Sequence, residues 1–127
     1  MILAIDCGNT NTVFALYSYN KNIRQESCWR INNDSKRTDD IYYPWLLQML
    51  NLSNFGLKDI TGVCIASVVP ETLLNIKSLI KKYFELDIFN LKDEDNIISY
   101  IGNVSKGLYN LNYIIPELRK YNKNFNF

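Results

Sequence analysis

Histidine is absent from this 127-residue sequence, and glycine and proline are scarce, with five and three residues. Without histidine there can be no Ser-His or Cys-His nucleophile pair and no histidine-ligated zinc. Any acid–base chemistry must therefore fall to carboxylates, lysine, tyrosine or cysteine.

Long apolar runs and clusters of one charge sign are missing as well. No window approaches the ~18 apolar residues that a membrane span requires, and the formal net charge is only +1. The first sixteen residues lack a basic start and carry Asp6 in their middle, unlike a secretory signal. We therefore expect a cytoplasmic protein that binds neither nucleic acid nor a membrane.

The three cysteines, Cys7, Cys28 and Cys64, are isolated in predicted strands or at their ends. Their spacing is not that of metal ligands, and an odd number argues against a disulfide framework. We predict reduced, half-buried thiols.

The composition, with 47% apolar and 21% charged residues, is that of one modest globular domain. Apolar periodicity predicts an α/β fold in the order βββαβαβ, a mixed sheet of about five strands with two flanking helices. The strands are expected at residues 2–6, 12–18, 23–32, 62–68 and 86–91, and the helices at residues 38–52 and 70–84. The first three strands form an antiparallel meander in this prediction.

One carboxylate and a polar turn join the first two predicted strands, in the segment Asp6-Cys7-Gly8-Asn9-Thr10-Asn11-Thr12-Val13. Gly8 can take φ > 0 without steric cost, and Asn9 and Asn11 tolerate left-handed conformations. A tight turn of this kind points several backbone N–H groups at one spot and forms an anion-binding concavity. Asp6 at its rim is suited to holding a hydrated Mg²⁺ against phosphate oxygens. The segment therefore predicts a hairpin that binds nucleotide phosphates.

An ordinary hairpin is the alternative interpretation, because Gly-Asn between two apolar runs commonly forms one. A Walker A loop is excluded, since no Gly-Lys-Ser/Thr follows, and no second glycine completes a dinucleotide fingerprint. On this alternative Asp6 caps the turn and Thr12 is a plain strand residue.

Three stretches, in order, resemble the type III pantothenate kinases of the acetate kinase, sugar kinase, Hsp70 and actin superfamily. They are Asp6–Thr12, Trp29–Ile31 with Arg37–Tyr42, and Ala66–Pro70. The resemblance implies a ribonuclease H-like, actin-like ATPase half-domain, which we place at residues 1–96. It further implies that Mg-ATP is bound by Asp6, Cys7, Gly8, Asn9, Thr10, Asn11, Thr12 and Val13, with Asp6 next to the metal.

In that family ATP phosphorylates the terminal hydroxyl of pantothenate, which gives 4′-phosphopantothenate, the first step towards coenzyme A. The resemblance thus implies ATP and pantothenate as partners, a monovalent cation (K⁺ or NH₄⁺), and a homodimer.

The family's Gly-Ala-Asp-Arg motif, whose aspartate is held to be the catalytic base, does not occur in this sequence. Residues 97–127 show no clean period, so we expect them to be the remnant of a truncated second subdomain. We expect neither the monovalent-cation site nor the family's homodimer in this chain.

The expected function is a truncated type III pantothenate kinase that is inactive as this chain, with no catalytic residue and no assigned substrate-binding residue. Three alternatives stay open: a non-catalytic nucleotide-binding or regulatory module, another phosphotransferase or phosphatase of the same superfamily, and a purely structural interaction protein.

Overall fold

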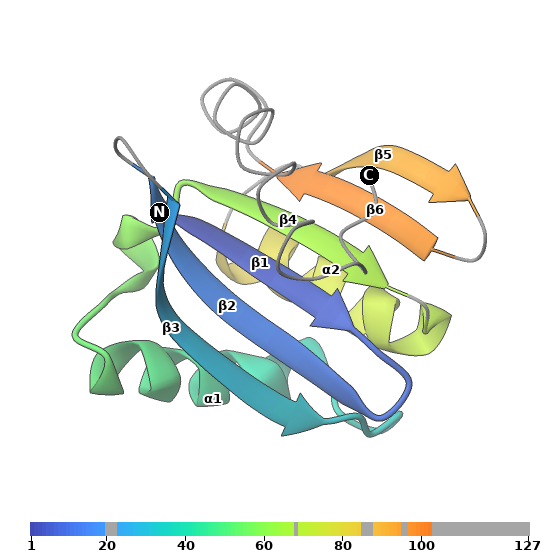
Figure 1. Ribbon diagram of the computed structural model, residues 1–127. Coiled ribbons are helices and arrows are strands. Elements are labelled where there is room, and N and C mark those ends of the chain that lie inside the picture. The colour runs from blue at the N-terminus through green and yellow to red at the C-terminus, as the bar shows by residue number, and fades with distance from the viewer. Residues whose placement is uncertain (20–22, 68, 85–87, 95–96, 103–127) are drawn as a thin grey trace.

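The computed structural model describes residues 1–19, 23–67, 69–84, 88–94 and 97–102. Within these residues the chain forms one mixed sheet of six strands in the order β3-β2-β1-β4-β6-β5, with two α-helices (Figure 1). The strands are β1 (Ile2–Cys7), β2 (Asn11–Tyr19), β3 (Ile23–Asn32), β4 (Gly62–Ser67), β5 (Ile88–Glu94) and β6 (Ile97–Gly102). The helices are α1 (Asp39–Leu52) and α2 (Pro70–Tyr83), and a short 3-10 turn, η1 (Leu57–Asp59), precedes β4.

The centre of the sheet is formed by β1 and β4, which run parallel to each other. All six residues of each strand are buried, as expected of strands covered on both faces. On the other side of β1, the antiparallel pairs β1–β2 and β2–β3 confirm the predicted meander.

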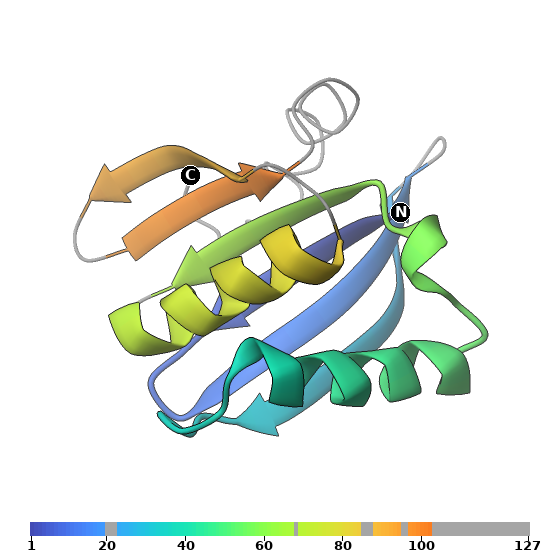
Figure 2. The same ribbon diagram turned by 180° about the vertical axis from the view of Figure 1, so that it is seen from behind.

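Both helices lie on the same face of the sheet (Figure 2). The core between this face and the helices includes the alternate β1 residues Leu3, Ile5 and Cys7. Helix α1 contributes Tyr42, Leu46 and Leu50, which recur every four residues and therefore share one face. Helix α2 contributes the fully buried Ile76, Leu79 and Ile80. No helix in the described part of the chain is long and apolar enough to cross a membrane.

The end of α1 is fixed by backbone hydrogen bonds around Asn54, which has a left-handed φ of 64°. The N–H of Phe55 donates to the backbone carbonyl of Leu50 at 2.9 Å, and the N–H of Asn54 donates to the backbone carbonyl of Asn51 at 3.0 Å. This pair of bonds is a Schellman motif, and asparagine tolerates the left-handed position better than most residues. The predicted end of this helix is confirmed.

The last hairpin extends the sheet beyond the predicted five strands. Strand β5 runs on to Glu94, whereas we expected the acidic segment there to break the fold. An edge strand tolerates such charges, because one side of its backbone faces away from the sheet. Strand β6 lies between β4 and β5 and begins where we expected an unpatterned tail. Residues 103–127 lie outside the described residues, so a remnant of a second subdomain there stays a prediction.

Candidate functional site

The carboxyl ends of four strands lie at one edge of the sheet; β5 is one of them, because β4 and β5 are both antiparallel to β6. Strand β3 runs in the same direction as β1, because both are antiparallel to β2, and β4 is parallel to β1. The arrowheads of β1, β3 and β4 therefore point the same way (Figure 1). Helix α1 starts at this edge after its N-cap Thr38, and α2 starts there after Val69. In open α/β sheets this edge is where ligands usually bind.

The β1–β2 turn lies at this edge and is closed by a 2.9 Å hydrogen bond from the Gly8 N–H to the Asn11 carbonyl. Its tip residues, Asn9 and Thr10, are exposed. None of the turn residues has a left-handed φ, so Gly8 does not use the positive φ that glycine can take without steric cost. Glycine is favoured for another reason, since a Cβ at position 8 would lie only 3.2 Å from the Asn11 carbonyl oxygen.

A residue that the sequence interpretation missed, Asn33, holds this turn from the end of β3. Its backbone N–H donates to the Thr10 carbonyl at 2.9 Å, and its side-chain amide donates to the Gly8 carbonyl. Its Oδ1 accepts the hydroxyl proton of Thr12 at 2.6 Å. The sequence offers one sign of this role: Asn33 directly follows a strand, and an asparagine side chain in such a position commonly forms hydrogen bonds with nearby backbone.

Asp6 is the last-but-one residue of β1, and only 9% of it is exposed. It lies next to Val13 of β2 and Ala66 of β4 in the strand register. Because side chains alternate along a strand, Asp6 points to the opposite face from the core residues Ile5 and Cys7.

Two other predicted site residues point into the protein. The Cys7 side chain is fully buried in the core beneath the helices, and burial raises the pKa of its thiol to about 12. The Thr12 side chain is also fully buried and is used in the bond to Asn33. Cys7 can therefore contribute only its backbone to a ligand, and Thr12 acts through the shape of the turn.

The stretch Arg37–Tyr42 lies close to this turn. The Arg37 guanidinium donates to the backbone carbonyl and, at 3.3 Å, to the side-chain oxygen of Asn32, and it lies 5.6 Å from the ring centre of Tyr42. Burial raises the pKa of the Tyr42 hydroxyl, and Arg37 partly offsets this. Arg37 thus ties the end of β3, and with it Asn33, to the first turn of α1.

The stretch Ala66–Pro70 joins β4 to α2. The N–H of Val69 donates to the Ser67 hydroxyl at 3.1 Å, which shapes the chain before Pro70 opens the helix. Val68 lies outside the described residues. In the stretch Trp29–Ile31, Arg30 is exposed on β3 and lies opposite Val13.

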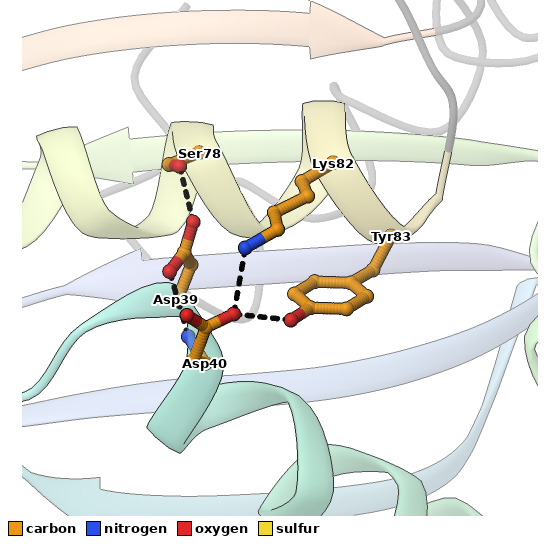
Figure 3. A network of polar contacts seen from close by, with 5 residues as sticks. All are labelled: Asp39, Asp40, Ser78, Lys82 and Tyr83. Atoms are coloured by element: carbon orange, nitrogen blue, oxygen red, sulfur yellow. Dashed lines mark hydrogen bonds and ion pairs between the residues drawn. The ribbon is translucent and has the colours of Figure 1, made fainter.

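A second polar cluster joins the first turn of α1 to the last turns of α2 (Figure 3). Asp40 accepts hydrogen bonds from the Lys82 ammonium at 2.7 Å and from the Tyr83 hydroxyl, and Asp39 accepts one from Ser78. Tyr83 also stacks on Tyr43, with ring centres 3.8 Å apart. Asp39 Oδ2 and Asp40 Oδ1 both accept hydrogen bonds from α2, so the cluster is a contact between the two helices.

The geometry of the β1–β2 turn fits a phosphate group. It combines two exposed tip residues, Asn9 and Thr10, a glycine that allows the close approach of the Asn11 carbonyl, and the buried carboxylate of Asp6 near the end of β1. In the part of the chain that the structure describes, no three acidic or thiol side chains converge to hold a metal on their own.

Comparison with protein families gives a match to the model described as type III pantothenate kinase, over residues 2–102. The chain belongs to the type III pantothenate kinase family. The match includes the whole described sheet and both helices, so the family resemblance of the three short stretches is confirmed across the fold.

Individual relatives carry the family's name as well. The type III pantothenate kinase of Maricaulis maris is 44% identical over 87 residues, which is 68% of this chain and 32% of that protein. Those of Zymomonas mobilis and Paramagnetospirillum magneticum are 46% and 43% identical, over 66% and 74% of this chain and 30% and 35% of theirs. The chain thus spans about a third of the length of these curated relatives.

Proposed function

We propose that this chain provides the ATPase-like half-domain of a type III pantothenate kinase and that its β1–β2 turn binds the phosphates of Mg-ATP. The observation that supports this most directly is the turn itself. A tight, externally braced loop with a rim carboxylate lies at the carboxyl edge of the sheet in a member of that family. The half-domain in this proposal extends past the predicted boundary at residue 96 to Gly102, because β6 lies between β4 and β5 in its sheet.

The residues of the turn divide the work. Backbone N–H groups at the exposed tip would bind phosphate oxygens, as in other anion-binding turns. Asp6 would hold the hydrated magnesium ion that neutralises phosphate charge. Cys7, Gly8, Asn11, Thr12 and Val13 set the path of the backbone, two of them through buried side chains.

The reaction proposed for the whole protein is the transfer of the γ-phosphoryl group of ATP to pantothenate, in the cytoplasm. Phosphoryl transfer depends mainly on positioning and on charge neutralisation around the phosphates. The half-domain supplies part of the positioning and part of the charge neutralisation at its β1–β2 turn, which we call the phosphate turn. The 127 residues contain no Gly-Ala-Asp-Arg motif, and we assign no residue of this chain to the base, to pantothenate or to a monovalent cation.

Titration of the purified chain with ATP, in the presence and absence of Mg²⁺, tests the phosphate site. Each charge-assisted hydrogen bond contributes on the order of 1.5–3 kcal/mol, against an association cost of about 4–15 kcal/mol. We therefore expect weak, Mg²⁺-dependent binding, with a Kd on the order of 0.1–1 mM. Asp6→Ala should abolish it, whereas Asp40→Asn, which removes a carboxylate from the helix contact, should leave it unchanged. Equal binding by the wild type and Asp6→Ala would contradict the assignment.

The enzymatic part of the proposal has its own test. The isolated 127-residue chain should not convert pantothenate to its phosphate above background in a coupled ADP-release assay, because no carboxylate here matches the family's base. ATP-dependent formation of 4′-phosphopantothenate by this chain would contradict the proposal, because it would show that these 127 residues contain the catalytic base.

A further inference from the structure

The side chain of Asn33 controls the orientation of one peptide unit in the phosphate turn. Its amide nitrogen donates to the Gly8 carbonyl, and its Oδ1 accepts the Thr12 hydroxyl proton at 2.6 Å. These partners fix which end of the amide points where, because a carbonyl oxygen can only accept a hydrogen bond. Thr12 is fully buried, so the side chain of Asn33 is anchored on the protein side.

The Gly8 carbonyl and the Asn9 N–H belong to the same peptide unit. No cis peptide bond occurs in the described residues, and in a trans peptide the C=O and N–H groups point in opposite directions. When the Gly8 carbonyl points towards Asn33, the Asn9 N–H must point away from Asn33. Asn9 lies at the exposed tip of the turn, where a ligand can approach it.

Glycine makes this peptide especially dependent on such a bond. A glycine has more accessible φ and ψ values than other residues, so the peptide that follows Gly8 can rotate easily. The hydrogen bond from Asn33 selects one of those orientations. The bond from the Gly8 N–H to the Asn11 carbonyl, at 2.9 Å, fixes the preceding peptide unit but not this one.

We propose that Asn33 is a positioning residue for phosphate binding: it orients the Gly8–Asn9 peptide so that the Asn9 N–H donates to a nucleotide phosphate. The inference rests on the proposed function of the turn and adds to it a specific donor and the residue that aims it. Asn33 touches no ligand in this arrangement and acts only through the backbone of the turn.

Two substitutions test the role of the side chain. Asn33→Ala removes both side-chain bonds, and Asn33→Asp keeps the acceptor for Thr12 but places a carboxylate oxygen against the Gly8 carbonyl. Both should weaken Mg-ATP binding by about tenfold or more, the loss expected for one charge-assisted hydrogen bond. The neighbouring Asn32→Ala, which loses only a 3.3 Å contact with Arg37, is the matched control and should bind as the wild type does.

An NMR measurement on the wild type and on Asn33→Asp distinguishes a role of Asn33 in orienting the Asn9 N–H from a role in the stability of the fold. In ¹H–¹⁵N spectra, the Asn9 amide should shift downfield as Mg-ATP is added to the wild type, and this shift should be lost in Asn33→Asp while the rest of the spectrum stays folded. The inference is overturned if the wild type binds Mg-ATP without a change at Asn9, or if both Asn33 variants bind with wild-type affinity. A wild type that binds no nucleotide would instead overturn the proposed function, and the inference with it.

Discussion

The phosphate turn and the contact between the helices are both polar networks, but they are built from different groups. The turn is held by uncharged side chains, Asn33 and Thr12, whose bonds are partly or wholly buried. The helix contact uses full charges on the surface, where the side chains of Lys82 and Asp40 are 51% and 61% exposed. Exposed ion pairs are screened by water and contribute little to stability.

The difference shows which network controls geometry. A buried polar group left without its partner costs roughly 1–3 kcal/mol, because it can no longer bond to water instead. An exposed group simply returns to solvent. The uncharged network therefore holds the turn in one conformation, whereas the charged one adds a minor attraction between helices that are already packed through their apolar faces.

The largest expected effect is the difference in alkylation rate between Cys7 and Cys28. The rate at Cys7 measures how often the core beneath the turn opens to solvent. Cys7 lies in the core with a pKa raised to about 12 by burial, and Cys28 is exposed on the outer strand β3. At pH 8 iodoacetamide should modify Cys28 faster than Cys7 by roughly 10³-fold or more, since Cys7 reacts only after opening of the core. Peptide mass mapping over time measures both rates.

Cys64 is the internal control for that experiment, because burial raises its pKa to about 12 as well, away from the turn. If Cys7 were modified much faster than Cys64, the turn would open independently of the sheet, and its network would be weaker than we infer.

A smaller effect is expected from breaking the buried network at its anchor. Thr12→Val keeps the volume but removes the hydroxyl that bonds to Asn33, and should lower the free energy of unfolding by about 1–3 kcal/mol. Urea unfolding followed by circular dichroism measures this change. Ser18→Ala, which removes a 2.7 Å bond to Glu26 on the partly exposed part of β2, should cost less. An equal cost for the two variants would remove the distinction between the two kinds of network.

The smallest effect is expected at the helix contact. Asp40→Asn should shift the unfolding midpoint by a small fraction of the Thr12→Val shift. The pKa of Asp40 is lowered by hydrogen bonds from Lys82 and Tyr83. Its contribution is therefore present above the ordinary aspartate pKa of 3.8 and is lost as the pH falls through the lowered value. Thermal unfolding of wild type and variant at pH 7 and pH 3 should show a smaller difference at pH 3 than at pH 7.

Most of the fold was predictable, because its elements have clear periodicity and end signals. The meander, the buried strand β4 and both helices follow from apolar spacing. Strand β6 was not predicted because it follows a run of acidic residues, which resembles a loop in sequence but forms part of the hairpin partner β5 in the structure.

The candidate site was only partly predictable. The segment Asp6–Val13 could be singled out by its residues, since a carboxylate, a glycine and amide side chains follow one strand. The role of Asn33 could not, because it depends on a tertiary contact between residues 25 positions apart. The reason for glycine at position 8 could not be predicted for a similar reason: a Cβ there would lie 3.2 Å from the Asn11 carbonyl oxygen, a close approach that depends on the folded turn.

The face of the sheet on which Asp6 lies depends on how many residues separate it from the start of β1. The Met1 carbonyl accepts the Thr61 N–H at 2.8 Å, which aligns β1 with the chain entering β4. From that anchor, side chains alternate between the two faces of the sheet, so Asp6 and Cys7 face opposite ways. Deletion of a single residue within β1 would turn both to the other face: the carboxylate would enter the apolar core, and the thiol would take the place of Asp6. The register of β1, as much as the chemistry of its residues, thus determines whether a carboxylate lies at the proposed nucleotide site.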